Sequence, residues 1–105
     1  MKADGYIIVT LFFHKEGNRW VGICKELGTS TFGRSIQEAH NRLNEAVELH
    51  LNTLEEVGER ERFLREHNIT LYSHKPKEKK VCLPVEDNAF VRPYIYPIYE
   101  ALLNS

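Results

Sequence analysis

Apolar side chains recur at every second position over residues 6–14, at the start of the chain. This period of two is typical of a β-strand that turns one face toward a core. The set expected to face the core is Ile7, Val9, Leu11 and Phe13. The opposite set also contains two large apolar residues, Ile8 and Phe12. We therefore expect the second face to be covered too, by the C-terminal part of the chain or by another subunit.

Two further strands are expected after this one. Residues 15–18 form a tight hairpin turn, in which Gly17 or Asn18 can adopt a positive φ. Residues 19–25 return as the second strand, and Gly22 within it indicates a close backbone approach or a bulge. The β-branched and aromatic residues 29–32 predict a short third strand.

A long amphipathic helix is expected next. Ser35 and Glu38 have the spacing of a capping box, which is worth about 1 kcal/mol. Leu49 lies outside the apolar arc of this helix and is a candidate contact to another molecule, whereas Gly58 ends or kinks the helix. The arc itself, which we expect to lie on the sheet, consists of Ile36, Ala39, Leu43, Ala46, Val47, Leu51, Leu54 and Val57.

The rest of the chain predicts a second helix and a fourth strand, followed by a lysine-rich stretch and an aromatic segment. Residues 59–67 predict a short second helix that ends at Asn68, and residues 69–73 alternate and predict a fourth strand. The lysine-rich residues 75–80 then lead to an aromatic segment, residues 90–99, that contains Pro93 and Pro97. Because proline cannot donate a backbone hydrogen bond, we expect this segment to be neither a central strand nor a continuous helix.

Together these patterns predict an α+β fold. We expect a small antiparallel sheet led by a β-hairpin, with one long amphipathic helix packed on it. A short second helix, a fourth strand and an extended C-terminal tail complete the fold. Residues 1–74 would form the domain, and residues 75–105 a basic linker followed by an aromatic, proline-containing tail.

Composition narrows the range of functions. A chain of 105 residues forms one modest core, and its net charge of −1 provides no general attraction to nucleic acid or membrane. The longest apolar run, residues 6–13, is too short to cross a bilayer, and the first residues do not resemble a signal peptide. We therefore expect a cytoplasmic protein in which both cysteines, Cys24 and Cys82, are reduced.

Three motifs make the chain resemble the HicB-like antitoxins. They are Trp-Val-Gly-Ile-Cys-Lys-Glu-Leu-Gly at 20–28, Gly-Arg-Ser-Ile-Gln-Glu-Ala at 33–39 and Leu-Asn-Glu-Ala-Val-Glu-Leu-His-Leu at 43–51. The resemblance implies a partial ribonuclease-H-like fold in a bacterial toxin–antitoxin system. It also implies that the chain neutralises a small basic HicA-like mRNA-cleaving toxin by protein–protein binding.

The chain departs from the HicB pattern in two regions. Lys25 stands where the family often has proline, and Gly28 and Thr29 replace a Pro-Gly pair. Many HicB proteins also carry a C-terminal DNA-binding module. Residues 75–105 are too short and too rich in proline for a helix-turn-helix, and no two-helix pattern supports a ribbon-helix-helix. DNA binding by this chain alone is therefore not expected.

No pattern in the sequence indicates catalysis. A ribonuclease-H-like enzyme holds divalent metal with acidic residues on its strands, yet the first strand has none and Glu26 stands alone after the second. His40 and His50 lie on the helix without the spacing of a metal site, and we expect local hydrogen bonds for them. His14 and His74 are expected to be exposed. We assign no catalytic residue, metal or cofactor, and we expect that the chain is not an enzyme.

Two regions are candidates for contact with other molecules. The long helix is rich in glutamate, which is typical either of a solvated face or of a docking surface for a basic partner. The tail aromatics either cover their own sheet or pack on another chain. The candidates for partner binding are Ile8, Phe12, Glu45, Glu48 and Glu55, and those for tail or oligomer contacts are Phe90, Tyr94, Tyr96 and Tyr99.

Exposed sheet edges and the aromatic tail lead us to expect a homodimer or a higher homo-oligomer. An alternative function within the same fold is an orphan dimeric scaffold, which would act as an adaptor or a small-ligand-binding protein without catalysis.

Overall fold

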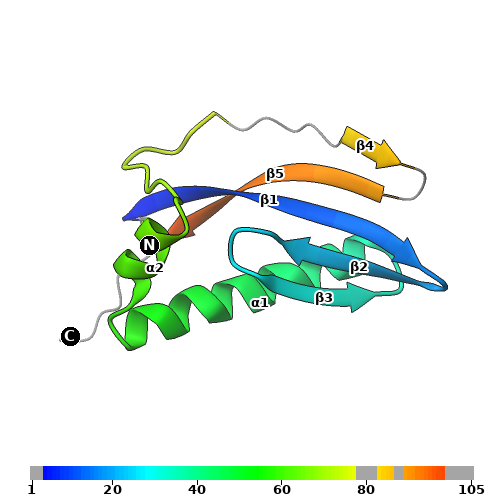
Figure 1. The fold of residues 1–105 in the computed structure, drawn as a ribbon, viewed down its shortest axis with the longest axis horizontal. Helices are drawn as coiled ribbons and strands as arrows, with labels where there is room; N and C mark the ends of the chain where they lie inside the picture. The colour runs from blue at the N-terminus through cyan, green and yellow to red at the C-terminus, as the bar shows by residue number, and fades with distance from the viewer. Residues whose placement is uncertain (1–3, 78–82, 87–88, 99–105) are drawn as a thin grey trace.

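The computed structural model describes residues 4–77, 83–86 and 89–98. Its elements in chain order are β1 (Gly5–Glu16), β2 (Arg19–Cys24), β3 (Thr29–Gly33), α1 (Ile36–Glu56), α2 (Arg60–Glu66), β4 (Leu83–Glu86) and β5 (Ala89–Ile98). The strands form one antiparallel sheet in the order β3-β2-β1-β5-β4. In Figure 1, β2 and β3 lie in front of α1, which packs on the far face of the sheet. The predicted α+β class is confirmed.

The hairpin and the third strand form where the sequence predicts them. The turn between β1 and β2 contains Gly17 at φ 59°, a value that L-residues rarely adopt. A Cβ atom on Gly22 would lie 2.9 Å from the Phe13 ring, so the absence of a side chain lets the ring approach β2 closely. The predicted close approach at Gly22 is therefore confirmed.

α1 begins and ends at the predicted residues. The Ser35 hydroxyl accepts a hydrogen bond of 3.1 Å from the backbone N–H of Glu38, which confirms the N-cap. The Glu38 carboxylate lies 3.0 Å from Arg42 in an ion pair. Gly58, at φ 73°, follows the last turn. The side of α1 that faces the sheet is buried at Ala39, His40, Leu43, Val47 and Leu51, whereas Ile36 and Val57 at its ends are exposed.

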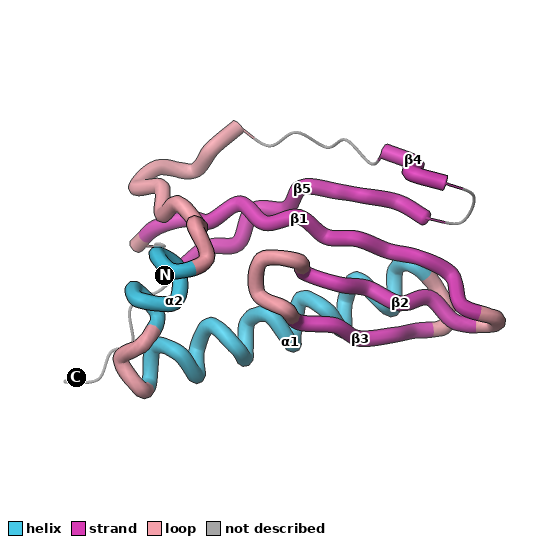
Figure 2. Tube along the Cα trace, in the orientation of Figure 1, coloured by secondary structure: helices cyan, strands magenta, loops and turns pink. Residues whose placement is uncertain are grey.

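The prediction of a fourth strand over residues 69–73 is wrong. This segment forms one isolated bridge, in which Tyr6 and Tyr72 exchange two backbone hydrogen bonds of 2.8 Å. Ile69 turns into the core directly after α2 and is 8% exposed. The segment therefore reaches β1 only near its beginning, and β4 forms later in the chain. Figure 2 shows this loop leaving α2 and passing the end of the sheet.

The prediction that residues 90–99 do not form a central strand is also wrong. β5 lies between β1 and β4 and pairs with β1 from Ala89 to Ile98. Its two prolines, Pro93 and Pro97, lie opposite Thr10 and Tyr6 of β1. Because proline has no backbone N–H group, neither residue can donate a hydrogen bond to a neighbouring strand.

The hydrogen-bond pattern of β1 shows how the sheet accommodates the two prolines. The Thr10 N–H donates to both Glu26 carboxylate oxygens, at 2.8 and 3.0 Å, and the Tyr6 N–H donates to Tyr72. Both groups therefore point away from β5, so these positions are the non-hydrogen-bonded pairs of the β1–β5 ladder. Pro93 and Pro97 consequently remove no bond to β1. The outer neighbour, β4, pairs only with residues 89–91 of β5, before either proline.

The core joins the two parts into which the sequence divides the chain. Tyr96 and Ile98 of β5 lie in the same buried cluster as Ile7 of β1 and Leu43 of α1. Leu64 anchors α2 to this cluster. The C-terminal segment is thus part of the sheet and of its core.

We predict that Tyr96→Ala lowers the free energy of unfolding by about 3–5 kcal/mol, because it removes a buried aromatic side chain from the core. Tyr72→Ala, at a tyrosine that is 40% exposed, should change it by less than about 1 kcal/mol. Urea unfolding followed by circular dichroism compares the two. An effect of Tyr96→Ala as small as that expected for Tyr72→Ala would show that Tyr96 of β5 does not stabilise the core.

Candidate functional site

The predicted partner-binding residues lie on two opposite sides of the molecule. Because Ile7 and Val9 point into the core beneath α1, their neighbours in β1 point the other way. Ile8 and Phe12 therefore face away from α1. Glu45 and Glu48 lie on the exposed side of α1. One flat partner surface cannot contain both pairs.

Strand register extends the patch around Ile8 and Phe12 across four strands. Phe12 lies opposite Ile23 and Val91, and Ile8 lies opposite Ile95. Directly paired residues of an antiparallel sheet share a face. The outer sheet face, as we name it, consists of Ile8, Phe12, Val21, Ile23, Phe32, Val91 and Ile95. Ile8 is 37% and Phe32 51% exposed, and the others are partly buried.

Sequence reasoning found only Ile8 and Phe12 of this face. Phe32 and Ile23 lie in predicted strands, but the side of the sheet on which their side chains lie depends on how β3 pairs with β2 and β2 with β1. Val91 and Ile95 lie in the segment expected to be a tail. The alternation in β1 was the available signal, and the neighbouring strands needed the structure.

Charged side chains of both signs border the outer sheet face. The Lys25 ammonium lies 5.5 Å from the centre of the Phe12 ring, and the Arg19 guanidinium lies 4.8 Å from that of Phe32. The Glu16 carboxylate lies 3.9 Å from Arg19. Each cation lies over a ring face, an arrangement that is electrostatically favourable.

The exposed side of α1 has a different character. Glu45, Glu48 and Glu56 are exposed and form no ion pair with any residue that the structure describes. Leu49 lies one turn after Glu45 and is 68% exposed. At about 100° per residue these side chains share one stripe. We name Glu45, Glu48, Leu49, Asn52 and Glu56 the acidic helix face.

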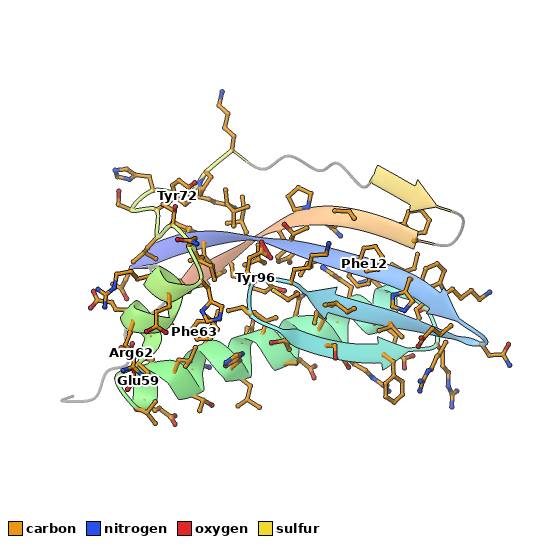
Figure 3. The ribbon with its side chains drawn as sticks, in the orientation of Figure 1. Phe12, Glu59, Arg62, Phe63, Tyr72 and Tyr96 are labelled. Atoms are coloured by element: carbon orange, nitrogen blue, oxygen red, sulfur yellow. The ribbon has the colours of Figure 1, made fainter. Side chains whose placement is uncertain are left out.

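Glu55 lies outside this stripe, although the sequence suggested it for partner binding. Its side chain is partly buried, and its carboxylate lies 3.3 Å from Arg60. This ion pair connects the end of α1 to the start of α2. A second ion pair, of 2.7 Å between Glu59 and Arg62, lies on the outside of α2 (Figure 3).

The aromatic residues of β5 pack within their own subunit. The Phe90 and Trp20 ring centres lie 6.0 Å apart, and Tyr94 meets His40 edge-on at 5.0 Å. The Tyr96 hydroxyl donates to the Asn44 side chain (Figure 3). Of the two interpretations of the tail, cover for its own sheet therefore holds for these three aromatics. Tyr99 lies outside the described residues.

His40 occupies an unusual position beneath the sheet. It is 8% exposed and lies between the rings of Phe13 and Tyr94. Its Nε2 atom has no hydrogen-bond partner among the described residues, so the local bond predicted for it is not found at this atom. Burial lowers the pKa of His40, and the nearby Arg92 lowers it further.

The other histidines follow the prediction in part. His50 Nδ1 lies 3.3 Å from the Thr29 hydroxyl, as expected for a locally bonded residue. His74 is exposed as predicted. The prediction for His14 is wrong, because its side chain is 27% exposed and packs beside Phe12.

The remaining ionisable groups of the core favour their neutral forms. Burial raises the pKa of the Cys24 thiol to about 11, so this thiol is protonated at neutral pH and is a poor nucleophile. Burial also raises the pKa of Tyr96. Cys82 lies outside the described part of the chain. Within that part, no group of three or more His, Cys, Asp or Glu side chains is placed to hold a metal ion.

Two of the hollows that described residues line lie beside the helices. One of about 150 Å³ lies between α1, α2 and the end of β5, with Glu48, Asn52 and Arg60 as its polar lining. It is smaller than the roughly 300–1,000 Å³ of typical small-molecule sites. The other, of about 360 Å³, is open to solvent beside α2 and lined mainly by Leu64, Ile69 and Leu71.

Comparison of the chain with protein-family models, curated proteins and solved structures gives no match. The likeness to HicB-like antitoxins therefore rests on the three sequence motifs alone. Among the described helices, none has the length and hydrophobicity needed to cross a membrane.

We predict that His40 makes the fold less stable in mild acid. Because its pKa in the folded chain is below the usual 6.5, the unfolded chain binds the proton first as the pH falls. The stabilisation is complete above about pH 6.5 and decreases below it. His40→Phe keeps a ring against Phe13 and Tyr94 but cannot titrate. Its unfolding free energy, measured by urea titration between about pH 7.5 and about pH 5, should fall less than that of the wild type.

The matched control is His74→Gln, at an exposed histidine. This variant should keep the pH dependence of the wild type. A His40→Phe profile parallel to the wild-type profile would refute the role of His40.

Proposed function

We propose that this chain is a HicB-like antitoxin, which neutralises a small basic HicA-like mRNA-cleaving toxin by direct binding in the cytoplasm. The observation that carries the proposal is the acidic helix face. Glu45, Glu48 and Glu56 point into solvent from one stripe of α1 and form no ion pair with another described residue. Leu49 lies within the same stripe and is exposed.

Electrostatics supports a basic partner for this face. A protein that binds RNA needs cationic side chains for the phosphates, and clustered carboxylates attract the same side chains. Charge complementarity of this kind accelerates association and disfavours partners of the wrong sign. Leu49 adds exposed apolar area that a partner can bury.

The proposed mechanism requires no bond to be broken. Neutralisation follows if the carboxylates of α1 occupy the cations that the toxin needs for RNA, so that RNA and antitoxin compete. α1 suits this task because it is held in place: it spans 21 residues, is capped by Ser35 and is buried on its other side. A preorganised surface loses little conformational entropy on binding.

We predict that the double variant Glu45→Lys/Glu48→Lys weakens binding to the cognate HicA-like toxin at least tenfold, which corresponds to about 1.4 kcal/mol. It should also lose the ability to rescue growth when the toxin is expressed. Isothermal titration calorimetry measures the affinity, and wild-type binding should weaken with added salt. Glu61→Lys, a charge reversal on the exposed side of α2, is the control and should bind normally.

The decisive negative result is the lack of a complex. If the wild-type chain binds no HicA-like toxin from the same genome at micromolar concentrations, the antitoxin proposal is wrong. Binding that is unchanged in the double variant would place the contact elsewhere on the chain.

A further inference from the structure

The outer sheet face is more apolar than the exposed side of a sheet usually is. Antiparallel sheets that pack one face on a core normally place polar side chains on the other. Here Phe12, Ile8 and Ile95 face away from the core, in the middle of the sheet. No described helix covers them, since the buried residues of α1 and Leu64 of α2 belong to the core on the other side.

We propose that the outer sheet face is the interface of a homodimer, in which two copies of the chain stack these faces around a two-fold axis. The antitoxin proposal concerns the other side of the molecule, and the two stand independently. The strands of one copy would lie about 10 Å from those of the other, as in a β-sandwich.

Charge favours a second copy as the occupant. A two-fold axis places a patch against itself, so a patch of one sign repels its own image. The acidic helix face is therefore unsuited to self-association. The outer sheet face is bordered by Arg19 and Lys25, and by Glu16 and Glu26. These charges balance, so that two copies can approach without net repulsion.

The same balance disfavours nucleic acid as the occupant. A surface that binds a phosphate backbone needs an excess of cations. Although Lys25 and Arg19 lie over aromatic rings, Glu16 lies 3.9 Å from Arg19 and offsets its charge. An apolar partner surface with a balanced rim fits better.

The size of the face is near what a dimer needs. β1, β2, β3 and β5 contain 12, 6, 5 and 10 residues. With a rise of about 3.4 Å and a strand spacing of about 4.8 Å, these residues cover roughly 540 Å² of flat sheet. Small specific interfaces bury about 600 Å² or more on each partner, so we infer a dimer of moderate affinity.

Position within the sheet identifies the residues that matter most. β1 is the central strand, with β2 and β3 on one side and β5 and β4 on the other. Phe12 therefore lies near the middle of the proposed interface, Ile8 lies on the part of β1 that pairs with β5 but not with β2, and Phe32 lies at the edge. A charge placed at Ile8 would be buried in the dimer, and a charge at Phe12 would replace the central ring with a carboxylate that only Lys25 lies near.

The test is sedimentation velocity of the full chain alone, from about 1 μM to about 100 μM. We expect the wild-type mass to rise from that of a 12.3 kDa monomer to twice this value. Phe12→Glu and Ile8→Glu, made separately, should each weaken the dimer at least tenfold. Leu49→Glu places the same charge on α1, at a residue that is 68% exposed, and should leave the dimer intact.

Several outcomes would overturn the proposal. A wild-type chain that stays monomeric at about 100 μM excludes the dimer whatever the variants do, and indicates another cover for this face. A dimer that Leu49→Glu disrupts and the β1 variants preserve has its interface elsewhere. Circular dichroism identifies variants that do not fold, and either folded β1 variant is sufficient. Titration with single-stranded polyuridine is a further control: tight binding that Phe12→Glu abolishes would assign the face to RNA.

Because the assay contains no toxin, its result is independent of the antitoxin proposal. A dimer that binds no toxin would keep this inference and reject the proposed function. A monomer that binds toxin through α1 would do the reverse.

Discussion

The fold depends on β1, which pairs with β5 along one edge, is hydrogen-bonded at several points along the other edge and is buried on one face. Its core-facing residues Ile7, Val9 and Leu11 are almost inaccessible to solvent, beneath α1. One edge pairs with β5 over most of its length, and the other pairs with β2 only from Leu11 onward. The Glu26 carboxylate receives the Thr10 N–H just where β2 ends. The Thr10 N–H is therefore paired although β2 does not reach it, because the Glu26 carboxylate accepts the hydrogen bond that a neighbouring strand would otherwise accept.

The central position of β1 also separates the two candidate surfaces. A strand that buries one face must present its alternate residues on the other, so Ile8 and Phe12 are placed opposite α1. The helix that covers the core then exposes its own far side, where Glu45 and Glu48 lie. One surface is apolar and balanced in charge, the other acidic. The two surfaces therefore differ in chemistry and face opposite directions.

The ionisable groups in the core follow from the same packing. Cys24, His40 and Tyr96 are buried, and the pKa of each is displaced in the direction that favours the neutral form. Each contacts aromatic or aliphatic neighbours that belong to the core. Carboxylates such as Glu45 and Glu48 of α1, by contrast, are exposed to solvent.

The sequence determined the local elements, because their signals are local. Alternation in β1, the Ser35 cap and Gly17 and Gly58 at the turns each depend on residues a few positions apart, and all are found as expected. The tertiary structure alone decided where the C-terminal segment lies. Pro93 and Pro97 argue against a central strand until the register shows that neither faces a hydrogen-bonded position of β1. It also decided the extent of the outer sheet face, since Val91 and Ile95 join Phe12 and Ile8 only through pairing across about 80 residues of chain. Such pairing depends on the whole core, which no short stretch of sequence contains.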